Sequence, residues 1–164
     1  MNINWQVKKS KVHGKGVFAS QDIVKGEKII QYMGEKVSRA EGDRRSELRI
    51  KKHLKSKTTG SVYIFELNKN FDIDGTSLQN KARYINHSCL PNCEVQILRG
   101  QIWIKSIKNI KKDEELTYDY GYEFDKEDYT DHKCCCGKKN CIGYIISKDQ
   151  WPKYKRFISK NKKK

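Results

Sequence analysis

Three cysteines close together in the C-terminal third most constrain how this chain can fold. The stretch KCCCGKKNCIG places Cys134, Cys136 and Cys141 at C-x-C-x4-C spacing. Gly137 and Asn140 can take the turn conformations that fold three thiolates around one ion. Zinc in a closed structural site takes four ligands in a tetrahedron, so this segment needs one more ligand from elsewhere in the chain.

The fourth ligand must come from the remaining cysteines, Cys135, Cys89 and Cys93. Cys135 stands between two ligands and is expected to point away. The stretch YINHSCLPNC, more than forty residues earlier, therefore supplies the fourth sulfur, with Cys89 preferred and Cys93 as the alternative. Unliganded buried thiols are the competing interpretation, which this spacing disfavours. We expect the ion to join a C-terminal segment to this loop.

The bulk properties favour a soluble, folded domain over a disordered basic chain. Nine Tyr, five Phe and three Trp in 164 residues are more than a disordered chain carries. The chain starts without a secretory signal, and no stretch is apolar enough for a membrane span, which predicts a soluble intracellular protein. In a reducing compartment clustered cysteines favour metal binding over disulfides.

The formal charge of +15 predicts attraction to polyanions. Much of this excess lies in the C-terminal run KYKRFISKNKKK. Two interpretations of this run stay open, a solvated tail and a nucleic-acid arm.

Local patterns predict a mainly β fold. The runs GVFA, KIIQYMG, SVYIFEL, FDIDG, CEVQIL and QIWIKSI are rich in β-branched and aromatic residues and bounded by turn formers. Gly100 predicts a hairpin turn between the last two. The exception is residues 38–57, where Ser38 and Glu41 form a capping box and predict a helical insert.

Six motifs in order resemble a SET-domain protein lysine methyltransferase with a post-SET zinc motif. They are HGKGVFA, IIQYMGE, VYIFEL, KARYINHSCLPNCE, DEELTYDYGYEF and CCCGKKNCIG. The resemblance implies short strands in small sheets with a knot-like C-terminal threading. It divides the chain into a SET domain at 8–124, a post-SET zinc segment at 130–146 and a basic tail at 147–164. No cysteine-rich pre-SET segment precedes the first motif.

The same resemblance implies S-adenosylmethionine as methyl donor and a peptide lysine as acceptor. Asn86 and His87 match the residues that bind the donor's amino-acid portion and adenine, and the glycine-rich turn lets the backbone approach it. The donor-binding residues implied are Gly14, Lys15, Gly16, Tyr63, Arg83, Asn86 and His87. Lys15 departs from the pattern, since many members carry an aromatic residue there.

Tyrosines carry the implied chemistry. Methyl transfer to an amine needs alignment, a neutral lysine and a site shielded from water. Aromatic rings pack on the lysine stem and stabilise developing positive charge. By the resemblance Tyr120 is the catalytic tyrosine, and Tyr118 and Tyr32 line the lysine channel with it. A catalytic pair of His87 with a cysteine is disfavoured, because Cys89 is assigned to zinc and no orienting acid is evident.

The sequence therefore predicts an S-adenosylmethionine-dependent protein-lysine N-methyltransferase that mainly mono- or dimethylates histone tails or another lysine-containing protein. The alternative is a catalytically silent zinc-stabilised module that binds nucleic acid or chromatin through its basic surface. A nuclear location is expected if the protein is eukaryotic or acts on a host, and a cytoplasmic one if it is bacterial. The sequence leaves the oligomeric state open.

Overall fold

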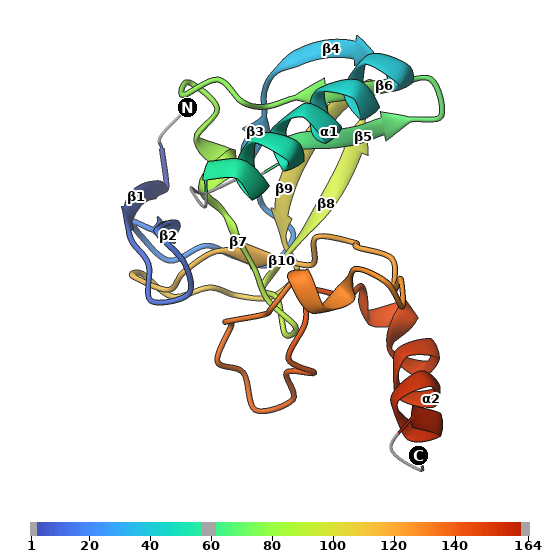
Figure 1. Ribbon diagram of the computed structural model, residues 1–164. Helices are drawn as coiled ribbons and strands as arrows, with labels where there is room; N and C mark the ends of the chain where they lie inside the picture. The colour runs from blue at the N-terminus through green and yellow to red at the C-terminus, as the bar shows by residue number, and fades with distance from the viewer. Residues whose placement is uncertain (1–2, 57–61, 162–164) are drawn as a thin grey trace. The chain divides into compact units, whose positions relative to one another are not determined.

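The computed structural model describes residues 3–56 and 62–161. The last residue of the predicted insert, the first residue of SVYIFEL and the last three residues of the tail lie outside these ranges. Helices and strands are labelled in Figure 1. The strands are β1 (Trp5–Lys9), β2 (Lys15–Ala19), β3 (Lys28–Tyr32), β4 (Glu35–Ser38), β5 (Ile64–Asn68), β6 (Phe71–Asp74), β7 (Asn86–His87), β8 (Cys93–Leu98), β9 (Gln101–Ser106) and β10 (Thr117–Tyr118). The α-helices are α1 (Arg39–Ser56) and α2 (Trp151–Asn161).

The mainly β prediction is confirmed, and each of the six apolar runs contains a strand. Within the described residues, the strands form four small sheets, two with two strands and two with three. Strand β9 alternates buried and more exposed residues along its length, as expected for a strand with one face on a core. No helix in the described part of the chain is long and apolar enough to cross a bilayer.

The described chain divides into two compact units. Unit 1 contains residues 1–27, 85–94 and 106–164, and unit 2 contains residues 28–84 and 95–105. Unit 1 is therefore assembled from three separate segments.

Unit 2 holds the sheets β3-β9-β8 and β4-β6-β5, apart from the outer ends of β8 and β9. The predicted hairpin joins β8 to β9, and its turn residues Arg99 and Gly100 have φ of 50° and 73°. Two consecutive positive φ angles are typical of the turn type that suits a right-twisted hairpin.

Helix α1 packs on β6 and β4 in unit 2, as Figure 1 shows. Ser38 caps it, because its Oγ accepts a hydrogen bond from the N–H of Glu41 at 3.3 Å. Ion pairs hold the helix against β6. Arg45 and Arg49 contact the buried carboxylate of Asp74 at 2.8 and 2.9 Å. Burial opposes ionisation of Asp74, but hydrogen bonds from Arg49, Thr76 and Arg45 hold its pKa well below its usual range.

Unit 1 is built on the antiparallel hairpin β1-β2 and on the parallel pair β7-β10. Backbone bridges join Phe18 to Glu115 and Ile23 to Ile110. The parallel pair places Asn86 beside Thr117 and His87 beside Tyr118, so two of the sequence motifs lie side by side.

The C-terminal run forms a packed helix, which the sequence analysis did not predict. In α2, Tyr154 is buried, and Trp151, Phe157 and Ile158 are partly buried on the same side. They pack with Phe124, Ile146, Tyr129, Ile142 and Tyr144. This spacing of three and four residues is that of an amphipathic helix face.

Candidate functional site

Asn86 fixes the glycine-rich loop between β1 and β2. Its side-chain nitrogen donates to the Lys15 carbonyl at 3.1 Å and lies 3.4 Å from the His13 carbonyl. Gly14 has φ of 47°, a conformation that glycine adopts without strain, and its carbonyl accepts from the Ser10 N–H at 2.9 Å. Gly14 and Lys15 are exposed, so a ligand can reach their backbone.

Glu115 holds Asn86 from the other side. Its Oε1 accepts from Asn86 Nδ2 at 2.7 Å and from Ser10 Oγ at 2.8 Å. A Cβ at Gly16 would overlap the Glu115 carboxylate, so a larger residue there would displace Glu115 from its bonds to Asn86 and Ser10. Glu115 is not among the site residues predicted from the sequence. The only available signal was its place in DEELTYDYGYEF, because its partners come from segments far away in the sequence.

The Asn86 nitrogen is surrounded by three acceptors, which fixes the orientation of its amide. Both N–H groups are therefore used inside the protein, and no described residue donates to Asn86 Oδ1. That oxygen can accept a hydrogen bond from a ligand.

Asn92, the last Asn of NHSCLPN, is a second residue that sequence reasoning missed. It is buried, its Nδ2 donates to the Glu115 carbonyl at 2.8 Å, and its Oδ1 accepts from the Thr117 N–H at 2.8 Å. Asn92 thus ties the NHSC loop to the start of β10.

His87 connects the cysteines to Tyr120. The side chain is 4% exposed. Its Nδ1 accepts from the Tyr120 N–H at 3.2 Å, and its Nε2 lies 3.7 Å from Cys89 Sγ. Burial lowers the pKa of His87, although the Asp119 carboxylate at 3.8 Å opposes this. The ring is therefore neutral at pH 7, with its proton on Nε2 directed toward sulfur.

Tyr120 is held by its hydroxyl and by its ring. The hydroxyl donates to the Ile85 carbonyl at 2.9 Å. Its ring lies at centroid distances of 5.4 Å from His87, 5.0 Å from Tyr118 and 5.9 Å from Tyr122. These contacts fix the phenol position before any ligand binds.

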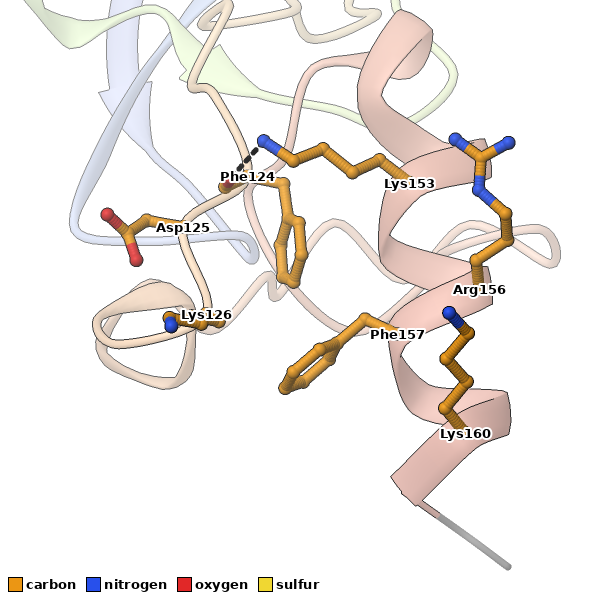
Figure 2. A pocket seen from close by; sticks show the side chains of 7 residues that line it. All are labelled: Phe124, Asp125, Lys126, Lys153, Arg156, Phe157 and Lys160. Atoms are coloured by element: carbon orange, nitrogen blue, oxygen red, sulfur yellow. Dashed lines mark hydrogen bonds between the residues drawn. The ribbon is translucent and has the colours of Figure 1, made fainter.

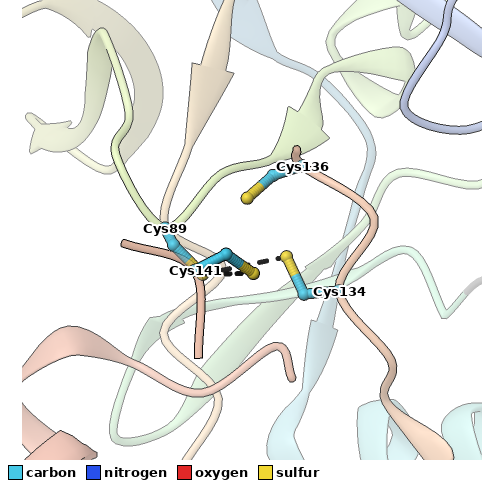
Figure 3. A group of neighbouring side chains, drawn as sticks. All are labelled: Cys89, Cys134, Cys136 and Cys141. Atoms are coloured by element: carbon cyan, nitrogen blue, oxygen red, sulfur yellow. Dashed lines mark hydrogen bonds between the residues drawn. The ribbon is translucent and has the colours of Figure 1, made fainter. Parts of the chain in front are cut away.

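The structure brings Cys89 together with Cys134, Cys136 and Cys141. Figure 3 shows the four sulfur atoms turned toward one another, and all lie within 4.8 Å of each other. Cys89 Sγ is 3.7 Å from both Cys134 Sγ and Cys141 Sγ. A tetrahedron with Zn–S bonds of 2.3 Å has sulfurs about 3.8 Å apart, so the set fits zinc. Outside this set, Cys93 is buried and Cys135 is exposed.

Without a metal, the thiols of Cys89 and Cys134 resist ionisation more than that of Cys136. Burial raises the pKa of Cys89 to about 12 and that of Cys134 well above its usual range. Burial also disfavours the thiolate of Cys136, but hydrogen bonds from the backbone of Cys89 and Lys138 outweigh it and lower the pKa to about 7. A bound divalent cation would favour the thiolate at every ligand, because its charge dominates such a site.

The other predicted site residues, Tyr32, Tyr63 and Arg83, come together in unit 2. The hydroxyl of buried Tyr32 donates to the Tyr63 carbonyl at 3.0 Å, and burial raises its pKa. The Arg83 guanidinium lies 3.8 Å from the centre of the Tyr63 ring and donates to the Thr76 carbonyl. A Cβ at Gly75 would overlap the Tyr32 ring.

Comparison with known families decides the classification. A model of the SET domain matches residues 14–121, which is more than half of the chain. The chain belongs to the SET-domain family. The matched region contains Gly14 to Gly16, Asn86, His87 and Tyr120, so the SET-domain resemblance predicted from the motifs is confirmed.

Three relatives show how far the similarity of this SET domain extends. The chain is 38% identical to proteins of Emericella nidulans and Saccharomyces cerevisiae and 36% identical to one of Candida albicans, in each case over 141 residues or 84% of this chain. All three are named histone-lysine N-methyltransferase, H3 lysine-4 specific. The match spans 11%, 13% and 13% of their lengths.

Proposed function

We propose that this SET domain is an S-adenosylmethionine-dependent protein-lysine N-methyltransferase. The observation that carries the proposal is the arrangement in unit 1. Asn86 is hydrogen-bonded to the glycine-rich turn at Lys15, and the neighbouring His87 is buried and accepts from the backbone N–H of Tyr120. A binding module has no need of this arrangement.

The residues of unit 1 fit the amino-acid portion of the donor. Asn86 Oδ1 is an acceptor without an internal donor among the described residues, which suits an ammonium group. The exposed backbone at Gly14 and Lys15 can contact the donor directly. Tyr63 and Arg83 are further residues that we propose to bind the donor.

Bound S-adenosylmethionine supplies an electrophilic methyl group on a sulfonium. The Tyr120 hydroxyl already donates its proton to the Ile85 carbonyl, so its oxygen lone pairs can accept weak C–H hydrogen bonds from that methyl. Tyr118 and Tyr32 are proposed to pack on the lysine stem and exclude water, which favours the neutral amine. No step requires a strong general base at Tyr120.

Zinc is proposed as a structural ion held by Cys89, Cys134, Cys136 and Cys141. It would join residues 134–141 to the loop that carries Asn86 and His87. His87 Nε2–H is directed to the Cys89 sulfur, which is the contact that orients a zinc ligand from outside the first coordination shell.

A histone tail is the proposed substrate, and lysine 4 of histone H3 is the first position to test because the three relatives are named for it. We propose chromatin as the place of action, with nucleic acid as an additional contact through the basic surface. Mono- and dimethyllysine are the expected products.

Titration calorimetry of purified protein with S-adenosylmethionine tests the first step. Binding at micromolar concentration supports the enzyme, and absence of binding by zinc-loaded, folded protein supports the catalytically silent module. A histone peptide array with labelled donor, followed by mass spectrometry, then identifies the lysine. Methyl transfer to other peptides, with none to the H3 tail, would overturn the substrate proposal. It would leave the proposed methyltransferase activity in place.

A further inference from the structure

Helix α2 has a second face that the packing of unit 1 does not use. Its apolar face contacts Phe124 and the neighbouring rings, including Tyr129, whose ring centre is 5.6 Å from that of Tyr154. Lys153, Arg156 and Lys160 follow one another at spacings of three and four residues, so they form a stripe along the helix. This stripe is not explained by the packing of the helix.

The stripe borders a cavity of about 470 Å³, shown in Figure 2. Four cations line it: Lys126 from the preceding loop, and Lys153, Arg156 and Lys160 from α2. Phe124 and Phe157 supply aromatic rings, and Asp125 supplies the carboxylate in the lining. Four positive charges against one negative charge give the lining a net charge of +3.

Most of these cations lack a partner within the described part of the chain. Lys126, Arg156 and Lys160 form no ion pair or side-chain hydrogen bond there. Lys153 donates to the Phe124 carbonyl at 3.1 Å, which neutralises none of its charge. The arginines of α1 differ, because Arg45 and Arg49 both contact Asp74. Unpaired cations that face one cavity leave a strong positive potential for an external anion.

We infer that this basic cavity, lined by Lys126, Lys153, Arg156 and Lys160, binds the phosphate backbone of double-stranded DNA. The stripe from Lys153 to Lys160 spans about 10 Å along the helix axis at 1.5 Å per residue. One DNA strand carries a phosphate about every 3.4 Å of helix axis, so the stripe can face about three phosphates. The choice of DNA over another polyanion rests on the proposed function, since a histone tail is presented beside DNA.

Substitutions in this surface can be chosen to change the affinity for DNA in opposite directions. Asp125 repels phosphate, so Asp125→Asn should tighten binding while Arg156→Glu with Lys160→Glu should weaken it. Lys155 provides a matched control, because it is an exposed lysine on the same helix that does not line the cavity. Phe157 is left unchanged because it packs in the core of unit 1.

Fluorescence anisotropy with a labelled 20-base-pair duplex at several salt concentrations measures the effect. The double variant should bind DNA at least about tenfold more weakly and lower the slope of log affinity against log salt by about two, one for each lost phosphate contact. Lys155→Glu should change affinity less than about threefold, and Asp125→Asn should tighten binding. Circular dichroism and methylation of a free peptide should be unchanged in all variants.

Equal weakening by Lys155→Glu would overturn the inference, because it would mean that any charge on the helix suffices. Competition by an acidic peptide at the same concentration of charge would assign the cavity to a protein partner instead. Methyl transfer and DNA binding are measured separately. DNA binding that maps to the cavity in a protein without transferase activity would therefore reject the proposed function and keep the DNA site.

Discussion

The predicted site residues are held in different ways in the two units. In unit 1, Asn86 and His87 are fixed by hydrogen bonds to Glu115, to the backbone of Lys15 and to the backbone of Tyr120. In unit 2, Tyr32 and Arg83 are fixed mainly by ring contacts and by bonds to backbone carbonyls.

The difference predicts unequal tolerance to substitution. In unit 1, the side chains of Asn86 and Glu115 hold each other, so loss of one leaves the other without that hydrogen bond in a partly buried position. In unit 2, the Tyr63 carbonyl that accepts from Tyr32 also accepts from the Gly75 N–H at 2.8 Å. Removal of the Tyr32 hydroxyl therefore leaves that carbonyl satisfied.

The largest expected effect follows from Cys89→Ser. It removes a proposed ligand and the partner of His87 Nε2, so metal content should fall from one zinc per chain to a small fraction. The control is Cys93→Ser, which should keep its zinc and lose about 1–3 kcal/mol of stability from a buried hydroxyl. Elemental analysis measures the zinc content of each variant, and denaturant titration measures its stability. Zinc loss in Cys93→Ser but not in Cys89→Ser would show that Cys93, and not Cys89, is the fourth ligand.

Tyr120→Phe should reduce turnover at least tenfold, which is about 1.4 kcal/mol of transition-state stabilisation. Affinity for the donor should stay nearly unchanged, because the ring contacts remain. Tyr122→Phe is a matched control, since its ring lies next to Tyr120, and it should change turnover less than about twofold. Single-turnover kinetics with a histone peptide measures the rate of methyl transfer separately from the affinity for the donor. A near-normal rate in Tyr120→Phe would remove Tyr120 from the chemistry.

Glu115→Gln should weaken donor binding about tenfold with little change in turnover, because it acts only through the position of Asn86. Loss of the negative charge weakens the charge-assisted hydrogen bonds that Ser10 and Asn86 donate to Oε1. The adjacent Glu114→Gln should leave binding unchanged. Calorimetry measures the affinity, and equal effects of both changes would contradict a positioning role for Glu115.

Tyr32→Phe should have a smaller effect, at most about 1 kcal/mol of stability, since its hydrogen-bond acceptor keeps another donor. Turnover should fall by less than about threefold. Thermal denaturation and the peptide assay give the two values. A loss as large as that of Tyr120→Phe would end the contrast between the two units.

The smallest change in rate is expected for Tyr118→Phe, where the product should change instead. The Tyr118 hydroxyl can hold a water beside the lysine amine, and a methyl group cannot replace the hydrogen bonds of that water. Its loss should shift products from mono- and dimethyllysine to higher methylation. Mass spectrometry over time tests this. Wild-type protein that accumulates trimethyllysine, indistinguishable from the variant, would refute it.

The sequence predicted the parts of the structure that depend on local patterns. The strands at KIIQY and QIWIKS, the cap at Ser38 and the turn at Gly100 follow from residue types within a few positions. Spacing also led to the set of three C-terminal cysteines, which the structure brings together.

Contacts between distant segments could not be predicted in the same way. Strands β7 and β10 have two residues each, too few for any periodicity, so the sequence did not predict their pairing. The partners of Glu115 and Asn92 depend on that pairing. In α2, Trp151, Tyr154, Phe157 and Ile158 recur at the spacing of an amphipathic helix. The lysines around them instead favoured interpretation of this run as a charged tail.

The division of unit 1 into three segments has a consequence for biosynthesis. All of unit 2 has been translated once residue 105 is added, whereas the thiol set of unit 1 requires residue 141. At about 5–20 residues per second, the ribosome needs about two to seven seconds for that interval. During this interval every residue of unit 2 has been synthesised, whereas Cys89 still lacks the complete set of its three partner thiols. Loading of the proposed zinc site therefore requires residue 141 and comes after the synthesis of unit 2.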